Sequence, residues 1–476
     1  MFKQEKAILL ILSVVYAIIG YATNSPTMQT LSLLGWLGIL QLTFSVISWI
    51  KRGNQLISPY VVFLLTLYVF SFGQSFLWAF GAESERSLVG FQGITIPDIF
   101  KAQVLTLIML AFFHIGATSY LINQERRNHL LTKQIDVRNY SNKLKQIGWF
   151  LFFISIVPYG RETIKEAIMS VMMGYGALYE GEDAIGLDNL SGVIADYFIP
   201  SVICLFIAYK DNVVVRNFFS GILIINIVII LITGGRSNAV ILIAILIILY
   251  HYLIKKFTRK WIVVGVIGAL FLLQILAYVG NTRTEGGRSL SITEMETGGN
   301  AAVEAVAEMG GSMFCLIKTM DLIPSKNDYR YGKSYAVAFT TLVPNFGFWA
   351  IHPAKKESNL GEWLTETLGL SYGTGFSMCA EAYANFGYLG IIVFYLWGWL
   401  FASVFGKIEI CVTTRNYVLL AFLLVMFWYI LKLPRNNFIN IVRPFFFVAG
   451  PIYLYCKRSK RMRYDTNKNR LKEVSV

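Results

Sequence analysis

Charged residues are scarce in this chain. Asp, Glu, Lys and Arg together make up only 15% of the 476 residues, whereas hydrophobic residues make up 55%. An ordinary soluble domain carries about 25% charged residues. The composition therefore excludes a water-soluble protein and indicates that lipid surrounds most of the chain.

Cysteines are few, and the sequence has no nucleotide-binding motif. The five cysteines show no CxxC or Cys/His spacing, which argues against a disulfide framework and a zinc site. They are Cys204, Cys315, Cys379, Cys411 and Cys456. No glycine-rich phosphate loop is followed by a lysine, and no repeat has the period of a solenoid. We therefore expect no metal and no cofactor.

Long apolar runs make up most of the chain. A helix needs about 20 residues to cross hydrocarbon about 30 Å thick. An open sheet would leave backbone groups unpaired in lipid, and the alternating pattern of a barrel is absent, so each span should be a helix. We predict an all-α polytopic membrane protein with about twelve spans. The predicted spans are residues 7–21, 31–50, 59–80, 100–121, 147–159, 193–209, 218–233, 238–254, 261–279, 386–406, 417–432 and 439–455.

Basic residues gather in some of the connections between these runs. With both termini in the cytoplasm, the inner segments hold 26 Lys and Arg against 7 Asp and Glu, whereas the rest of the chain holds 16 against 21. This distribution follows the positive-inside rule for a multi-pass protein of the cytoplasmic (inner) membrane. Because the clusters lie between spans and not on one polar face, no nucleic-acid partner is expected despite the net charge of +14.

The whole chain, 1–476, is predicted to form a single polytopic membrane domain with no separate soluble domain. Its first run resembles a signal peptide but has no convincing cleavage site, so we interpret it as an uncleaved helix. Residues 456–476 are predicted to form a basic cytoplasmic tail that faces lipid headgroups. Two predicted extracytoplasmic loops, 160–192 and 280–385, are too long to be simple connections, which favours a functional role for them. The larger loop should contain helical segments.

Arginines on the predicted outer side are unexpected under the positive-inside rule. Arg236 lies in a short Thr-Gly-Gly-Arg-Ser-Asn turn between two spans, and Arg435 and Arg443 flank the start of the last span. The guanidinium fork suits phosphate at headgroup depth, and free N–H groups at a helix start add to an anion site. Alternatively, these side chains bind lipid phosphate or snorkel. Weaker candidates on the outer side are Arg161, Arg283 and Arg288.

Other polar residues on the outer side are candidates for chemistry. Ser377, Glu381 and Asn385 are four residues apart, so a helix would place them on one face beside a span. Glu381 is a candidate general base, or alternatively the structural partner of an outer arginine. His352 is the only one of the four histidines predicted outside, which makes it a candidate proton acceptor. Glu308 begins a run of small residues that permits close packing.

At these motifs the chain resembles the bacterial polysaccharide repeat-unit polymerases of the Wzy type, which make O-antigen and capsule. Four segments carry the resemblance. They are Gly234-Gly235-Arg236-Ser237, Glu308-Met309-Gly310-Gly311-Ser312, Tyr331-Gly332-Lys333-Ser334-Tyr335 leading to Val343-Pro344-Asn345, and Gly375-Phe376-Ser377 through Glu381 and Asn385 to Gly390. Their order and their placement on one membrane side make the combination more specific than any single motif.

The resemblance implies a metal-independent glycosyltransferase with a fold similar to GT-C-like polymerases and ligases. It would move a growing glycan from its polyprenyl diphosphate carrier, undecaprenyl diphosphate, onto a new lipid-linked repeat unit at the outer face of the membrane. The outer arginines, with Ser377, Asn385 and Glu308, would bind the diphosphate and the substrate, and Glu381 or His352 would take the proton of the acceptor hydroxyl. Membrane lipids, a chain-length regulator and a flippase would be its partners.

Two other membrane functions compete with this interpretation. A ligase that moves finished glycan to a final acceptor has the same topology and a large outer loop. A flippase for lipid-linked oligosaccharide also has about twelve spans, but such transporters commonly show internal repeats and central ionisable residues, which this sequence lacks.

Overall fold

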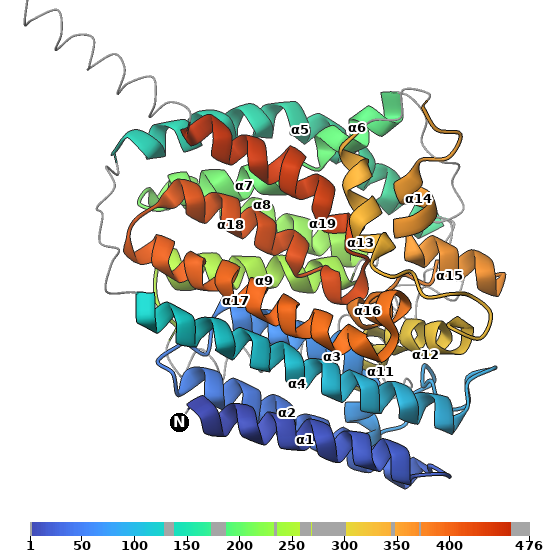
Figure 1. Cartoon of the computed structure of the whole chain (residues 1–476). Helices are drawn as coiled ribbons and strands as arrows, with labels where there is room; N and C mark the ends of the chain where they lie inside the picture. The colour runs from blue at the N-terminus through green and yellow to red at the C-terminus, as the bar shows by residue number, and fades with distance from the viewer. Residues whose placement is uncertain are drawn as a thin grey trace, which may run out of the picture.

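The computed structural model describes residues 2–127, 138–172, 187–232, 236–257, 268, 301–343, 348–370 and 373–457. Every regular element in these ranges is a helix, so the predicted all-α class is confirmed for them. Figure 1 shows the long helices lying side by side and running back and forth along one direction.

Nine helical stretches in the described ranges are long and apolar enough to cross a membrane, and they coincide with nine of the twelve predicted spans. They are Gln4–Ala22 in α1 (Phe2–Ala22), α2 (Met28–Ile50), α3 (Pro59–Ala79), Ile96–Leu121 in α4 (Ile96–Arg127), Ser191–Ala208 in α6 (Leu187–Ala195) and α7 (Phe198–Ala208), Val213–Leu231 in α8 (Val213–Ile232), Met378–Thr413 in α16 (Met378–Phe386) and α17 (Gly390–Thr413), Tyr417–Arg435 starting with α18 (Tyr417–Ile430), and Ile439–Lys457 starting with α19 (Ile439–Arg443). The chain is therefore a multi-pass membrane protein.

The other three predicted spans have different outcomes. The eighth corresponds to α9 (Arg236–Leu253), which is apolar from Asn238 to Leu253 but shorter than the nine. The fifth lies inside α5 (Arg138–Met172), a helix that passes through Pro158 and continues to Met172, so residues 160–172 of the predicted loop are helical. The ninth, 261–279, lies outside the described residues.

Glycines allow α4 and α17 to pack with their backbones in contact. A Cβ atom on Gly398 would lie 1.8 Å from the carbonyl oxygen of Phe113, and one on Gly116 would lie 2.0 Å from the carbonyl oxygen of Tyr395. In lipid, helices associate through this close van der Waals packing, because the hydrophobic effect does not drive them together. The two glycines therefore fix the position of α17, the helix that continues from α16.

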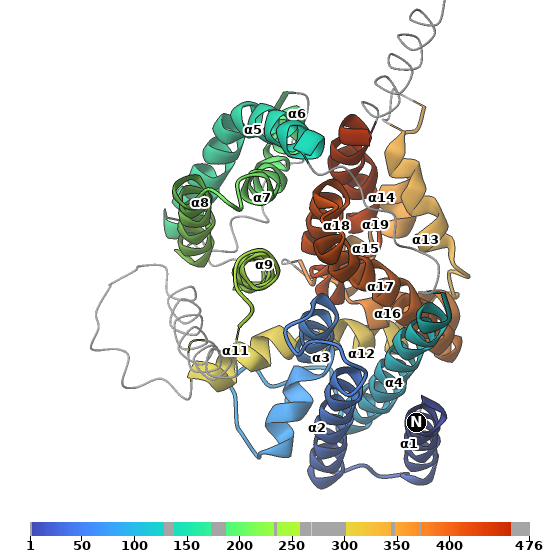
Figure 2. The same cartoon turned by 90° about the vertical axis from the view of Figure 1, so that its left-hand side faces the viewer.

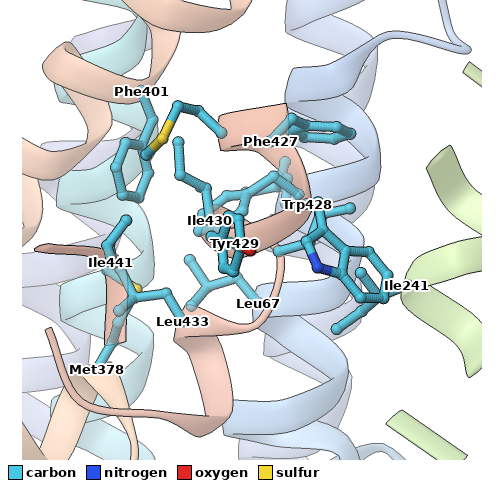
Figure 3. Close-up of a cluster of buried hydrophobic side chains, with 14 of the residues drawn as sticks. Leu67, Ile241, Met378, Phe401, Phe427, Trp428, Tyr429, Ile430, Leu433 and Ile441 are labelled. Atoms are coloured by element: carbon cyan, nitrogen blue, oxygen red, sulfur yellow. The ribbon is translucent and has the colours of Figure 1, made fainter. Parts of the chain in front are cut away.

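Helix α18 occupies the centre of the molecule. In the end-on view of Figure 2, α5, α7 and α8 lie on one side and α1, α2 and α4 on the other, with α9, α17 and α18 between them. Figure 3 shows apolar side chains of α18, including Phe427 and Ile430, packed against Leu67 of α3, Ile241 of α9 and Phe401 of α17. This core joins the two groups of helices.

Short helices gather at one end of the bundle (Figure 1). They are α11 (Ala301–Gly310), α12 (Met313–Leu322), α13 (Lys333–Val337), α14 (Pro353–Ser358), α15 (Leu360–Leu368) and α16. The start of α1 and the end of the last helix lie at the opposite end. Polar residues from distant parts of the sequence therefore meet at the end formed by the short helices.

Candidate functional site

Helix α16 carries the three polar residues that the sequence placed on one helical face. Ser377 is the N-cap: its Oγ accepts a hydrogen bond from the backbone N–H of Ala380 at 3.2 Å, and its carbonyl accepts from the N–H of Glu381 at 2.9 Å. The side chains of Ser377, Glu381 and Asn385 are all buried, with at most 1% of each residue exposed. The helix thus holds a carboxyl group and an amide in a dry environment.

Ser334, at the start of α13, connects Glu381 with Asn385. The Asn385 Nδ2 donates to Ser334 Oγ at 2.8 Å, and Ser334 Oγ donates to Glu381 Oε1 at 2.8 Å. The amide donor occupies a lone pair of the hydroxyl, so the hydroxyl hydrogen is directed at the carboxylate. Ser334 was not predicted individually as a site residue, although it belongs to one of the four motifs that carry the family resemblance.

The second carboxylate oxygen of Glu381 binds a different segment. Oε2 accepts a hydrogen bond from the backbone N–H of Phe438 at 2.7 Å. Phe438 lies between Arg435 and Arg443, two of the predicted diphosphate ligands. We call Glu381, Ser334, Asn385 and the Phe438 N–H the Glu381 cluster. One buried carboxylate therefore joins α16, α13 and the arginine-bearing segment.

A turn at residues 330–332 holds α13 against the end of α16. The N–H groups of Arg330 and Tyr331 donate to the carbonyls of Ala384 and Asn385, each at 2.9 Å. Tyr331 and Gly332 have φ values of 49° and 82°, in the left-handed region that glycine adopts without steric cost. The conformation allows the backbone to turn back toward α16 and explains the glycine at position 332, whereas Tyr331 adopts it at a steric cost.

Arg330 supplies a positive charge near the cluster. Its Nη1 lies 3.3 Å from Glu357 Oε2, and its guanidinium lies 5.0 Å from the centre of the Trp363 ring. Burial lowers the pKa of Arg330, while the charges of Glu357 and Glu381 oppose that shift. Lys333 Nζ also pairs with Glu357, at 3.0 Å. These groups form an ionic network at this end of the bundle.

The predicted arginines have different surroundings. Arg435 ends the 3-10 turn Leu433–Arg435, and its backbone carbonyl lies beside Gly375. Burial raises the pKa of Cys315 to about 12, and the positive charge of Arg435 acts against that rise. Arg443 ends α19 and is exposed. Arg236 is the first residue of α9, and its side chain is not among the described ones. The remaining three are Arg161, which is exposed on α5, and Arg283 and Arg288, which lie outside the described residues.

His352 and Glu308 make structural contacts. His352 is the N-cap of α14: its Nδ1 accepts from the N–H of Ala354 at 3.2 Å, so the ring hydrogen is on Nε2, which lies 3.1 Å from the carbonyl oxygen of Val343. Glu308, on α11, forms an ion pair with Arg86. Helix α11 packs on α3. Among the described residues, neither side chain has a hydrogen bond to the Glu381 cluster.

The Glu381 cluster is suited to proton transfer and to positioning. Glu381 accepts one hydrogen bond on each oxygen, and a carboxylate has about four lone-pair sites, so it retains acceptor capacity. No group of three His, Cys, Asp or Glu side chains among the described residues could hold a metal ion. A fixed carboxylate near cations is an arrangement that transfer of a group from a phosphate carrier can use.

Comparisons with known proteins identify the family. No curated protein and no solved structure matches the chain. The family model described as O-antigen polysaccharide polymerase Wzy matches residues 6–462, which is nearly the whole chain. The resemblance inferred from the four motifs is therefore confirmed. The chain belongs to the O-antigen polysaccharide polymerase Wzy family.

Proposed function

We propose that this protein joins glycan repeat units at the outer face of the cytoplasmic membrane, in a reaction centre at the Glu381 cluster. Membership of the family establishes the general activity: the protein is a glycosyltransferase that polymerises lipid-linked repeat units. The observation that carries the location is the hydrogen bond from Phe438 N–H to Glu381, since it joins the carboxylate to the segment between Arg435 and Arg443.

In the proposed reaction, a hydroxyl of the new lipid-linked unit attacks the anomeric carbon of the growing glycan. The bond between that carbon and the carrier diphosphate breaks, and the diphosphate leaves with the electron pair. Arg435 and Arg443, together with Arg236, stabilise the negative charge that builds on the diphosphate. Arg161, Arg283 and Arg288 remain further candidates for binding it. Glu381 takes the hydroxyl proton and also holds the arginine-bearing segment in place.

Glu381 is the better supported of the two candidate bases. Both ring nitrogens of His352 are engaged, one by Ala354 and the other by Val343, whereas Glu381 retains unused lone pairs. In addition, Glu381 is only 1% exposed, so bulk water does not compete with the reacting groups. Ser377 and Asn385 act through Glu381, and Glu308 supports the fold through its ion pair with Arg86.

The charge distribution supports the proposed orientation. Exposed basic residues lie at both ends of the bundle. On the side where the described chain starts and finishes they include Lys51 after α2, Lys255 after α9 and Lys457 at the end of the last helix. The short helices at the other end also carry acidic residues, among them Glu357 on α14 and Glu366 on α15. With the side where the described chain starts and finishes in the cytoplasm, the short helices and the Glu381 cluster face outward. A flippase would deliver the substrates, and a chain-length regulator would act on the product.

Substitution of the arginines tests the location of the site. We expect Arg435→Ala and Arg443→Ala to lower the polymerisation rate about 100-fold while the protein still inserts in the membrane, because each removes a donor to the developing charge. The measurement is the glycan ladder made by a deletion strain that carries each variant. Arg415→Ala is the control, because Arg415 is exposed in the α17–α18 turn at the opposite end. Full-length polymer from both variants would contradict the site.

The same deletion strain distinguishes the competing activities. Single repeat units without a ladder are the expected result for loss of a polymerase. Polymer that accumulates on its lipid carrier would indicate a ligase, and lipid-linked units retained in the cytoplasm would indicate a flippase. Purified protein should also make a ladder from lipid-linked repeat units alone, without a nucleotide sugar.

A further inference from the structure

An apolar groove runs along the outward face of α17. The groove has a volume of about 560 Å³, and its floor is formed by Leu389, Ile392, Val393, Leu396 and Leu400. Each of them lies three or four residues from another member of the set, so they follow one face of the helix. From Leu389 to Leu400 the helix rises about 16 Å, which is half of a hydrocarbon layer about 30 Å thick. The α17 groove therefore extends across about one leaflet.

The head of the α17 groove adjoins the Glu381 cluster. Tyr335 and Phe386 line the head, and their rings are 6.5 Å apart. Tyr335 follows Ser334 in sequence, and its ring lies 5.5 Å from the ring of Phe438. Burial and then the charge of Glu381 raise the pKa of Tyr335. Ser334 and Phe438, the two residues that donate hydrogen bonds to the Glu381 carboxylate, thus adjoin the wall of the groove.

Positive charge adjoins the head of the groove. The ring of Phe438 packs on two residues that line the groove, Tyr335 at 5.5 Å and Trp397 at 5.4 Å. Phe438 lies between Arg435 and Arg443 in sequence, and Arg443 is exposed. The floor residues are themselves open to the bilayer, with Leu389 67% and Leu396 57% exposed. The groove thus combines an apolar channel of leaflet depth with an arginine-bearing segment at one end.

We propose that the α17 groove binds the polyprenyl chain of a lipid-linked substrate and places its diphosphate beside the segment that carries Arg435 and Arg443. The inference rests on the proposed function, and it adds the route by which the substrate reaches the Glu381 cluster from the membrane. A long apolar chain with an anionic head matches the groove in length, in polarity and in the sign of the charge at its head. The groove also continues into the wall of the reaction centre, which an ordinary lipid-facing helix surface does not do.

Photocross-linking tests occupancy without requiring turnover. Leu396 is replaced by p-benzoylphenylalanine in the full chain, purified in nanodiscs, and irradiated with radiolabelled undecaprenyl diphosphate. Leu40, on α2 and 62% exposed, is replaced in the same way as the control, since it faces outward to a similar extent but lies outside the groove. We expect at least about tenfold more labelled adduct at position 396. Equal labelling at both positions, or labelling at 396 that excess phosphatidylglycerol abolishes, would overturn the proposal.

Filling the groove tests its part in the reaction. Leu396→Trp should raise the KM for lipid-linked repeat units about tenfold, equivalent to about 1.4 kcal/mol of binding. Leu40→Trp should leave the KM unchanged. If Leu396→Trp matches Leu40→Trp while the wild type makes a ladder, the groove assignment fails and the polymerase function stands. If the wild type makes no ladder but the cross-link forms at position 396, the groove stands and the proposed reaction fails.

Discussion

At the scale of single residues, the carboxylate of Glu381 connects three segments that are far apart in sequence. Its two oxygens accept hydrogen bonds from the Ser334 hydroxyl of α13 and from the backbone N–H of Phe438. Ser377 is the N-cap of α16, the helix that carries Glu381. Each buried polar group in this set has a partner, and removing one partner of a buried hydrogen bond costs about 1–3 kcal/mol. The cluster therefore responds to small chemical changes that leave the volume of the side chain unaltered.

Glu381→Gln separates proton transfer from positioning. The glutamine oxygen still accepts from the Phe438 N–H, so the arginine-bearing segment stays in place, but the amide does not take a proton from a hydroxyl. We expect kcat to fall about 100-fold with little change in KM, as measured by ladder formation from purified lipid-linked units. Glu381→Ala should lose both roles, because alanine neither takes the proton nor accepts the hydrogen bond from the Phe438 N–H. A glutamine variant that turns over at the wild-type rate would limit Glu381 to positioning.

Ser334→Ala tests the connection between Glu381 and Asn385. The substitution removes the donor to Glu381 Oε1 and the acceptor of Asn385 Nδ2. We expect the free energy of unfolding to fall by about 1–3 kcal/mol, measured as a lower thermal midpoint in detergent. Ser325→Ala is the control, because Ser325 is exposed. If both alanine variants unfold at the wild-type temperature, the hydrogen-bond chain does not stabilise the site.

Spacing along one helix was sufficient to predict part of this cluster. Four-residue intervals placed Ser377, Glu381 and Asn385 on one face, and the structure has them on one helix. The contact of Ser334 with Glu381 spans 47 residues, and no local pattern in one sequence encodes such a pairing. For His352, the sequence predicts a side of the membrane, but its N-cap role depends on the backbone of α14.

At the scale of helices, apolar run length predicted the spans well because hydrocarbon thickness sets a minimum length. The same rule does not say where a helix continues beyond the membrane, as α5 does to Met172. Nor does it detect a break inside an apolar stretch. Gly387, with a φ of 58°, separates α16 from α17, although hydropathy is continuous across it. The orientation of Glu381 depends on that break.

Gly398→Ala tests the contact between α4 and α17. The new Cβ would lie 1.8 Å from the carbonyl oxygen of Phe113, so the two backbones must separate. We expect a loss of stability of about 1–3 kcal/mol, seen as a lower thermal midpoint. Gly221→Ala on α8 is the matched control, because no atom lies within 4 Å of its added Cβ. Since alanine favours a helix over glycine, the control should be neutral or stabilising, and equal destabilisation of both variants would argue against this packing.

At the scale of the whole molecule, an exposed lysine is present at each end of the bundle. Lys255 follows α9 at one end, and Lys326 follows α12 at the other, and both side chains are exposed. The five native cysteines are all buried, so they should contribute little background to labelling with a membrane-impermeant maleimide. Single cysteines at these two lysines therefore report the orientation of the bundle directly.

In intact cells from which any outer barrier has been removed, we expect Lys326→Cys to react with the maleimide and Lys255→Cys to react only after the membrane is permeabilised. The expectation follows because positive charge is retained on the cytoplasmic side, while transfer between lipid-linked glycans requires the Glu381 cluster to face the opposite side. Labelling of the unsubstituted chain gives the background. The reverse pattern would place the cluster in the cytoplasm, where glycans that have already crossed the membrane do not reach it, and would therefore exclude polymerisation at this site.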